Sequence, residues 1–188
     1  SAAPISQRNV SGWLPYWTTK TSTNAFLNNA SMFTDVSPFW HDTAIATITS
    51  DIPSGVKIVN NDLSYGTRSS VLAQLKTARV PIIPSVTDST GKLYLSQVMK
   101  TPARRASFVR NLTALAVDNN YDGLDLDFEK FAFSDGSKTW ATTRPAWISF
   151  IKEISASRKL SKCPHSRLTC RSKAILLRTH DTKGYGGA

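Results

Sequence analysis

The sequence feature that most constrains the fold is the run at residues 121–129, Tyr-Asp-Gly-Leu-Asp-Leu-Asp-Phe-Glu, in which acidic and apolar residues alternate. Because successive side chains of a β-strand point to opposite faces, a strand here places Asp125, Asp127 and Glu129 on one face and the apolar residues on the other. Neighbouring carboxylates on that face would lie roughly 6.6 Å apart. Their crowding is costly unless water, a cation or a substrate answers it. A protonated carboxyl beside an ionised one is what cleavage of a glycosidic bond requires.

Two simpler interpretations of this run compete with catalysis. Alternating acidic and apolar residues are typical of a solvated strand in an ordinary antiparallel sheet. A calcium-binding loop also places acids at alternate positions, but such a loop needs a glycine where this sequence has Leu126 or Phe128. The calcium interpretation is therefore disfavoured, and the run predicts no metal site.

The complete pattern from Asp122, D-G-x-D-x-D-x-E, resembles the active-site signature of glycoside hydrolase family 18, the chitinase-like family. The resemblance implies that Glu129 is the general acid that protonates the leaving glycosidic oxygen. It implies that Asp127 holds the 2-acetamido group of the substrate and that Asp125 shares a proton or a charge with Asp127 as a coupled pair. In this family the substrate itself supplies the nucleophile, and the configuration is retained.

Apolar periodicity along the chain predicts strands that alternate with helices, which is typical of parallel β/α units. The predicted strands and helices follow one another through residues 1–157 and amount to about four units. Strands are expected at 10–17, 32–40, 80–86 and 121–129, with a polar turn at 18–24 and an added hairpin at 43–49 and 56–59. Helices are expected at 67–78, 92–99, 101–118 and from 139 or 144 to 156, and the third of them should carry Arg104, Arg105 and Arg110 on its outward side. The predicted fold class is α/β, a (β/α)8 TIM-barrel type apparently truncated after about four units, because a complete barrel needs about 250 residues. The acidic run follows three earlier strands, and the resemblance places it on the fourth strand of such a barrel.

Aromatic side chains near the first two predicted strands are candidates for stacking on sugar rings. Trp13, Tyr16, Trp17 and Trp40 form this set of substrate-binding candidates. The alternative is that these rings pack between strands and helices, as most barrel aromatics do. Asp122 is also counted as a candidate substrate-binding residue, although the favoured role of Asp122 and Gly123 is to shape the start of the acidic strand.

The sequence departs from the family at two places. Chitinases of this group usually carry Ser-x-Gly-Gly on the third strand, where this chain has Ser-Val-Thr-Asp at residues 85–88. This difference favours the family branch that acts on N-acetylglucosamine of bacterial wall or spore cortex. The tyrosine and tryptophan that family members supply from later strands have no visible counterpart, since Tyr185 is the only late tyrosine.

The composition changes sharply near Ser161. Residues 1–157 contain 15 Lys+Arg and 12 Asp+Glu, whereas residues 158–188 contain 8 Lys+Arg and a single Asp, so the tail carries most of the net charge of +10. We therefore predict two parts: residues 1–157, the N-terminal half of a hydrolase barrel, and 158–188, an atypical basic tail. A frameshifted or disordered tail is the preferred interpretation; a basic arm and a Cys163–Cys170 disulfide stay open. Zinc is disfavoured because the Cys and His residues lack the usual ligand spacing.

The expected partner is an N-acetylglucosamine polysaccharide, with no cofactor, no nucleic acid and no membrane. No run of apolar residues is long enough for a membrane span. The start Ser1-Ala2-Ala3-Pro4 resembles a mature end left after a leader is removed, so a secreted or wall-associated location is expected. Two functions are therefore considered: a glycosidase, and a catalytically inactive chitinase-like carbohydrate binder. Hydrolysis of a chitobioside by the truncated chain would favour the first, and binding without hydrolysis would favour the second.

Overall fold

The computed structural model describes residues 9–91, 93–128, 140–157 and 176–179. Within these ranges the strands form one sheet in the order β1-β2-β4-β5-β6, and every neighbouring pair in that order is parallel. The sixth strand, β3, pairs antiparallel with β2. The strands are β1 (Ser11–Pro15), β2 (Asp35–Ile45), β3 (Val56–Asn60), β4 (Ser85–Asp88), β5 (Gly123–Asp127) and β6 (Leu176–Thr179).

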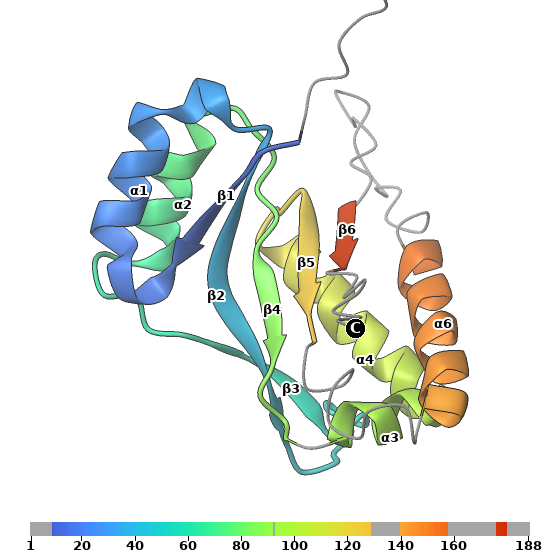
Figure 1. Cartoon of the computed structure of the whole chain (residues 1–188). Coiled ribbons are helices and arrows are strands. Elements are labelled where there is room, and N and C mark those ends of the chain that lie inside the picture. The colour runs from blue at the N-terminus through green and yellow to red at the C-terminus, as the bar shows by residue number, and fades with distance from the viewer. Residues whose placement is uncertain (1–8, 92, 129–139, 158–175, 180–188) are drawn as a thin grey trace, which may run out of the picture.

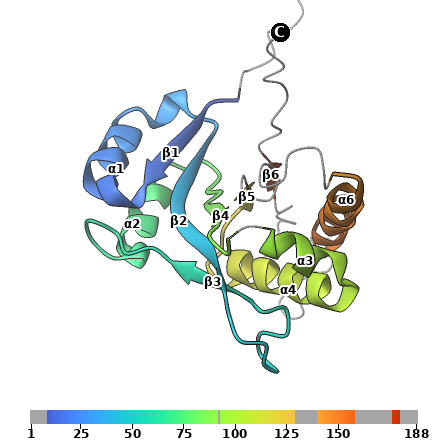
Figure 2. The same ribbon diagram turned by 60° about the horizontal axis from the view of Figure 1, so that its bottom comes forward.

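Helices connect the parallel strands, as the periodicity predicted. Figures 1 and 2 place α1 and α2 together beside β1, while α3, α4 and α6 form a second group toward β5. None of the described helices is long and apolar enough to cross a membrane. The helices are α1 (Thr19–Asn28), α2 (Arg68–Lys76), α3 (Tyr94–Lys100), α4 (Pro102–Asp118) and α6 (Trp140–Ser157), with short 3-10 turns at Tyr16–Thr18 and Ala30–Met32.

Local sequence signals explain where two helices begin. Thr67 caps α2: its hydroxyl accepts a hydrogen bond from the backbone N–H of Ser70, and the Ser70 hydroxyl accepts one from the N–H of Thr67. This reciprocal arrangement satisfies two backbone donors that a helix start leaves without partners. Pro102 occupies the first turn of α4, where its missing N–H costs nothing.

The core includes buried side chains of both groups of helices, and its aromatic part lies at α4 and α6. Phe108 of α4 stacks on Phe150 of α6 with ring centroids 5.6 Å apart. Phe128, directly after β5, lies 6.2 Å from the first ring and 6.4 Å from the second. All three side chains are buried, so the end of the acidic strand is anchored to α4 and α6 by aromatic packing.

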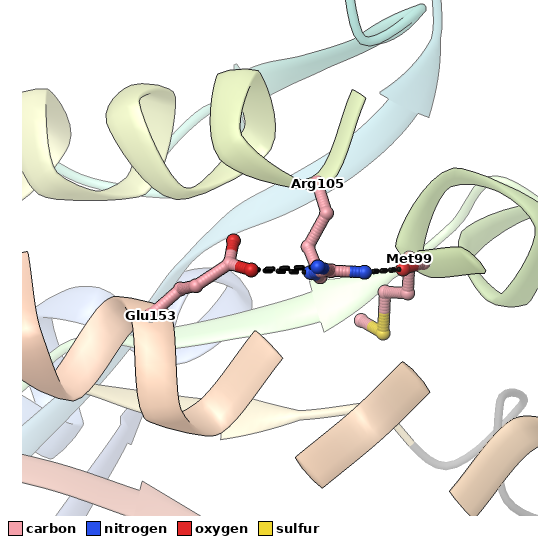
Figure 3. A network of polar contacts seen from close by, with 3 residues as sticks. All are labelled: Met99, Arg105 and Glu153. Carbon is pink, nitrogen blue, oxygen red and sulfur yellow. Dashed lines mark hydrogen bonds and ion pairs between the residues drawn. The ribbon is translucent and has the colours of Figure 1, made fainter. Parts of the chain in front are cut away.

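One ion pair connects the three helices of this group (Figure 3). Arg105 on α4 lies 2.7 Å from the Glu153 carboxylate on α6 and donates to the backbone carbonyl of Met99 on α3 at 2.6 Å. The periodicity predicted that Arg105 faces outward, but its side chain is 11% exposed. That prediction was wrong for Arg105 because its long side chain extends along the helix surface to partners on both neighbouring helices.

The structure corrects two local predictions and decides between two predicted starts of a helix. Residues 18–24 are polar and were expected to form a turn, but α1 begins at Thr19 and buries Thr19, Thr23 and Phe26. The strand expected at 80–86 is β4 at 85–88, since Pro81 and Pro84 cannot donate to a ladder; only a single bridge, Val36 to Ile82, forms before it. The helix near residue 140 starts at Trp140 and continues through Pro145.

Four residues of the basic tail belong to the sheet. Residues 176–179 form β6 and pair in parallel with Gly123 through Leu126 of β5. The cysteines and histidines of the tail lie outside the described residues. The division into residues 1–157 and 158–188, and the frameshift interpretation of the tail, stay predictions.

Candidate active site

Strand register brings the acidic residues together with polar residues of β4. Ser85 lies beside Asp125, and Thr87 lies beside Asp127, as parallel partners. Paired residues on adjacent strands share a face of the sheet, with strands about 4.8 Å apart. Leu124 and Leu126 belong to the buried core, so the alternation predicted from the sequence is the one the strand adopts.

The deeper part of this face is a buried hydroxyl–carboxylate cluster. Ser37 of β2 and Ser85 of β4 each donate to Oδ2 of Asp125 at 3.3 Å, and their own hydroxyls are 2.8 Å apart. The three residues are between 2% and 3% exposed. Asp125 is therefore held by hydroxyls from two neighbouring strands, which suits a residue that acts through Asp127 better than one that touches substrate.

The outer part of the same face is more open. Asp127 and Thr87 are half-buried, and the Thr87 hydroxyl donates to Oδ1 of Asp42, a half-buried residue of β2. Asp42 reaches this face because β2 contains an irregularity: Phe39 pairs with Ser85, but His41 pairs with the next residue of β4. One extra residue in β2 reverses the alternation beyond Phe39.

Three of the four aromatic candidates gather around Phe39 at the C-terminal end of β1. Trp13 and Trp17 lie 5.4 and 5.7 Å from the Phe39 ring and 5.7 Å from each other, and Tyr16 lies 5.9 Å from Phe39. Trp13 is 53% exposed and Trp17 51%. Trp13 pairs with Ser37, so this aromatic cluster shares the sheet face that carries Asp125.

The structure places Trp40 and Asp122 away from this cluster. Trp40 lies in the middle of β2, is 1% exposed and belongs to the core, which favours the packing interpretation. Asp122 precedes β5 and accepts a hydrogen bond from the N–H of Ile82 at 3.0 Å. It lines a hollow with Lys76 and Arg79 at the N-terminal ends of the strands, opposite the end where Asp127 lies. Neither position supports a substrate-binding role, and that of Asp122 supports shaping of the strand start.

A second polar group lies behind the sheet. The two ring nitrogens of His41 lie 2.7 Å from Oδ1 of Asn60 and 3.0 Å from the hydroxyl of Tyr121, the residue before Asp122. Since Asn60 Oδ1 accepts, Nδ1 carries the proton and Nε2 accepts from Tyr121. Burial lowers the pKa of His41 to about 4 and raises the pKa of Tyr121 to about 12. Tyr121 is thus a buried residue that holds His41, which is a structural role.

Glu129 lies outside the described residues. Its predecessor Phe128 is packed between α4 and α6. Among the described residues no group of three or more His, Cys, Asp or Glu side chains is placed to hold a metal ion. The sequence did not predict four residues of this face, because their position depends on the register between strands: Ser37, Phe39, Asp42 and Thr87. Only Thr87 had a sequence signal, since it belongs to the Ser-Val-Thr-Asp run at 85–88.

The whole face has a layered arrangement. The carboxylate of Asp125 is buried and held by two hydroxyls, and those of Asp42 and Asp127 are half-buried. The exposed rings of Trp13 and Trp17 lie on the same side of the sheet, at β1 and the turn that follows it. Aromatic faces of this kind can stack on the apolar faces of a sugar ring while carboxylates accept its hydroxyl and amide hydrogens.

Comparison with known proteins agrees with this geometry. Residues 8–178 match the family described as Glycosyl hydrolases family 18. A comparison with curated proteins found no match.

Solved structures with the same fold include three informative relatives. A chitinase from Chromobacterium violaceum ATCC 12472 has a TM-score of 0.61 at 16% identity, covering 92% of this chain and 45% of that one. The spore cortex-lytic enzyme SleL of Bacillus cereus gives 0.59 at 13%, covering 91% and 34%. The chitinase-like agglutinin RobpsCRA from Robinia pseudoacacia gives 0.56 at 18%, covering 90% and 45%. This likeness confirms the predicted fold class, a truncated TIM-barrel type. The chain spans less than half the length of each of these relatives.

Proposed function

Because the chain belongs to family 18 of the glycosyl hydrolases, we propose that it cleaves β-1,4-linked N-acetylglucosamine polymers, in chitin or in bacterial wall and spore-cortex glycan. The observation that carries the proposal is the shared sheet face: Asp125 and Asp127 lie on the same side as the exposed rings of Trp13 and Trp17. The chitinase and the cortex-lytic enzyme with this fold support the substrate class.

In the proposed mechanism Glu129 gives its proton to the glycosidic oxygen as the bond from that oxygen to the anomeric carbon breaks. The acetamido oxygen of the same sugar attacks the anomeric carbon and forms an oxazolinium ion. Asp127 holds the acetamido group in line for this attack, and Asp125, held by Ser37 and Ser85, keeps Asp127 in place. Water then attacks the anomeric carbon as the bond from that carbon to the acetamido oxygen breaks, gives a proton to Glu129 and leaves the configuration retained.

Hydrolysis of a chromogenic chitobioside by the full chain tests this mechanism. We expect Glu129→Gln to lower the rate by a factor of about 100 to 10,000, the range that a general acid contributes. Asp51→Asn is the matched control, because Asp51 is exposed in the loop between β2 and β3 and its side chain accepts only from the neighbouring Ser50 among the described residues. Equal rates for the parent chain and the Glu129 variant contradict the assignment of the general acid.

A second candidate function is sugar binding without turnover. It is favoured by the likeness to a chitinase-like agglutinin and by the coverage of less than half of each relative. Retention of the chain on chitin beads, together with no release of chromophore by chain that retains its folded circular dichroism spectrum, supports this candidate over the hydrolase.

A further inference from the structure

The irregularity in β2 decides which of its residues lie on the same sheet face as Asp125 and Asp127. In a regular strand Phe39, His41 and Thr43 would share one face, and Asp42 would point toward the helices. The shift between Phe39 and His41 instead aligns Asp42 with Thr87, which itself is aligned with Asp127. Bulges are concentrated next to active sites because they re-aim a side chain in this way.

Hydrogen bonds on both faces agree with this reversal. On the site face the Thr87 hydroxyl donates to Asp42 Oδ1. On the opposite face the Thr43 hydroxyl donates to Asp88 at 3.2 Å, and both of those residues are buried. The alternation of β2 is thus opposite on the two sides of the irregularity.

Thr87 orients the carboxylate of Asp42, and one oxygen of this carboxylate can accept a hydrogen bond from a ligand. Its oxygen Oδ1 is occupied by Thr87, and among the described residues nothing donates a hydrogen bond to Oδ2. Asp42 is half-buried, in contrast to the almost fully buried Asp125. An ionised carboxylate only accepts hydrogen bonds, so its natural ligand is a hydroxyl or an amide N–H.

We propose that Asp42 is a specificity-determining residue of the glycan site: it accepts a hydrogen bond from a hydroxyl or N–H of the sugar bound beside Asp127, with Thr87 orienting its carboxylate. The inference rests on the proposed function, since it assumes that a glycan occupies this face. It also deepens the substrate class, because a third carboxylate on the face selects neutral sugars against sugars that carry a carboxylate of their own.

Titration calorimetry of the full chain tests the inference, in an E129Q background that prevents turnover. The probes are the β-1,4-linked tetramer of N-acetylglucosamine and a wall-type tetramer in which alternate sugars carry a lactyl carboxylate. Asp42→Asn should weaken binding of the neutral tetramer about tenfold or more, the effect of a lost charge-assisted hydrogen bond. It should weaken binding of the carboxylate-bearing tetramer less, or strengthen it. Asp51→Asn, the matched control, should change neither.

Thr87→Val provides the second variant, because it keeps the charge of Asp42 and removes the donor that orients it. It should weaken binding of the neutral tetramer by about two- to tenfold, and it decides the test if Asp42→Asn does not fold. Unchanged affinity in the folded variants, or equal losses for both tetramers, overturns the inference and leaves the proposed function standing. If the parent chain binds neither tetramer, both the inference and the proposed function are overturned.

Discussion

At the scale of single residues, two tryptophans show how position on a strand decides a role. Trp13 and Trp40 both lie on strands of the parallel sheet, yet the first is 53% exposed and the second 1%. Trp13 points to the face of Asp125, whereas Trp40 lies at the irregularity of β2 and packs in the core. Residue type alone made both candidates for sugar stacking, and strand register separates them.

Trp17 offers a direct test of the aromatic cluster. We expect Trp17→Ala to weaken binding of the N-acetylglucosamine tetramer by about 1 to 2 kcal/mol, because a large exposed ring loses its contact area with the sugar. Trp140→Ala is the matched control, since Trp140 is 56% exposed on α6, away from the cluster. Calorimetric affinities that fall equally in both variants contradict a stacking role for Trp17.

His41 predicts how stability depends on pH. Burial lowers its pKa from 6.5 to about 4 in the folded chain, so between these values the unfolded chain binds more protons and stability falls as pH falls. We expect the free energy of unfolding to be about 2 to 3 kcal/mol lower at about pH 4.5 than at about pH 7.5 from this residue alone.

Urea unfolding of the parent chain and of His41→Gln at both pH values measures this contribution. The variant should be less stable at neutral pH, because Tyr121 and Asn60 lose their partner, but it should lose less stability on acidification. A decrease of the same size in both proteins assigns the acid sensitivity to other groups.

At the scale of secondary structure elements, α4 connects the helices around the acidic strand. It packs Phe108 against Phe128 and Phe150, and it holds α3 and α6 through Arg105. The strand end that precedes Glu129 is therefore held by helices from both sides of β5 in the sequence: α3 and α4 come before β5, and α6 comes after it.

Arg105→Ala should lower the free energy of unfolding by about 1 to 3 kcal/mol, because it leaves the Met99 carbonyl and the Glu153 carboxylate without their charged donor. The lower half of that range is expected, since Glu153 is 36% exposed and solvent screens the pair. Arg110→Ala on the exposed face of the same helix should change stability by less than about 0.5 kcal/mol. Urea unfolding compares the two, and equal values for both variants remove the ion pair as a source of stability.

At the scale of the whole molecule, the sheet continues past β5 into the basic tail. β6 covers the edge of β5 along Gly123 to Leu126. An uncovered parallel edge of apolar residues is prone to pair with other chains. Residues 176–179 therefore protect the strand that carries the acidic signature, although the composition of residues 158–188 differs from that of residues 1–157.

Deleting residues 158–188 should lower the free energy of unfolding by roughly 2 to 4 kcal/mol, since each net ladder hydrogen bond contributes about 1 kcal/mol. It should also increase aggregation, which light scattering measures. Deleting residues 180–188 alone keeps β6 and serves as the control. Identical stability of the two shortened chains contradicts a structural role for β6 and favours the interpretation of the tail as unrelated sequence.

Much of the fold follows from periodicity that is local in the chain. The β/α alternation, the start of α4 at Pro102, the hairpin of β2 and β3, and the opposite faces of Asp125 and Leu126 were all predictable. The reason is that helical and extended backbones repeat over a few residues, so a run of sequence contains the whole signal. The same holds for the acidic signature, because the resemblance to the family rests on consecutive residues, 121–129.

The composition of the site face depended on contacts between distant segments. Ser37 and Ser85, 48 positions apart, meet at Asp125 only because β2 and β4 are neighbours in the sheet. Asp42 faces Thr87 because one extra residue reverses the alternation of β2, and no local pattern marks that residue. The spacing within residues 121–129 was enough to locate the strand with the acidic signature and to point to the family that the chain belongs to. Tertiary structure decided which side chains surround that strand, because register between strands is set by packing of the whole sheet.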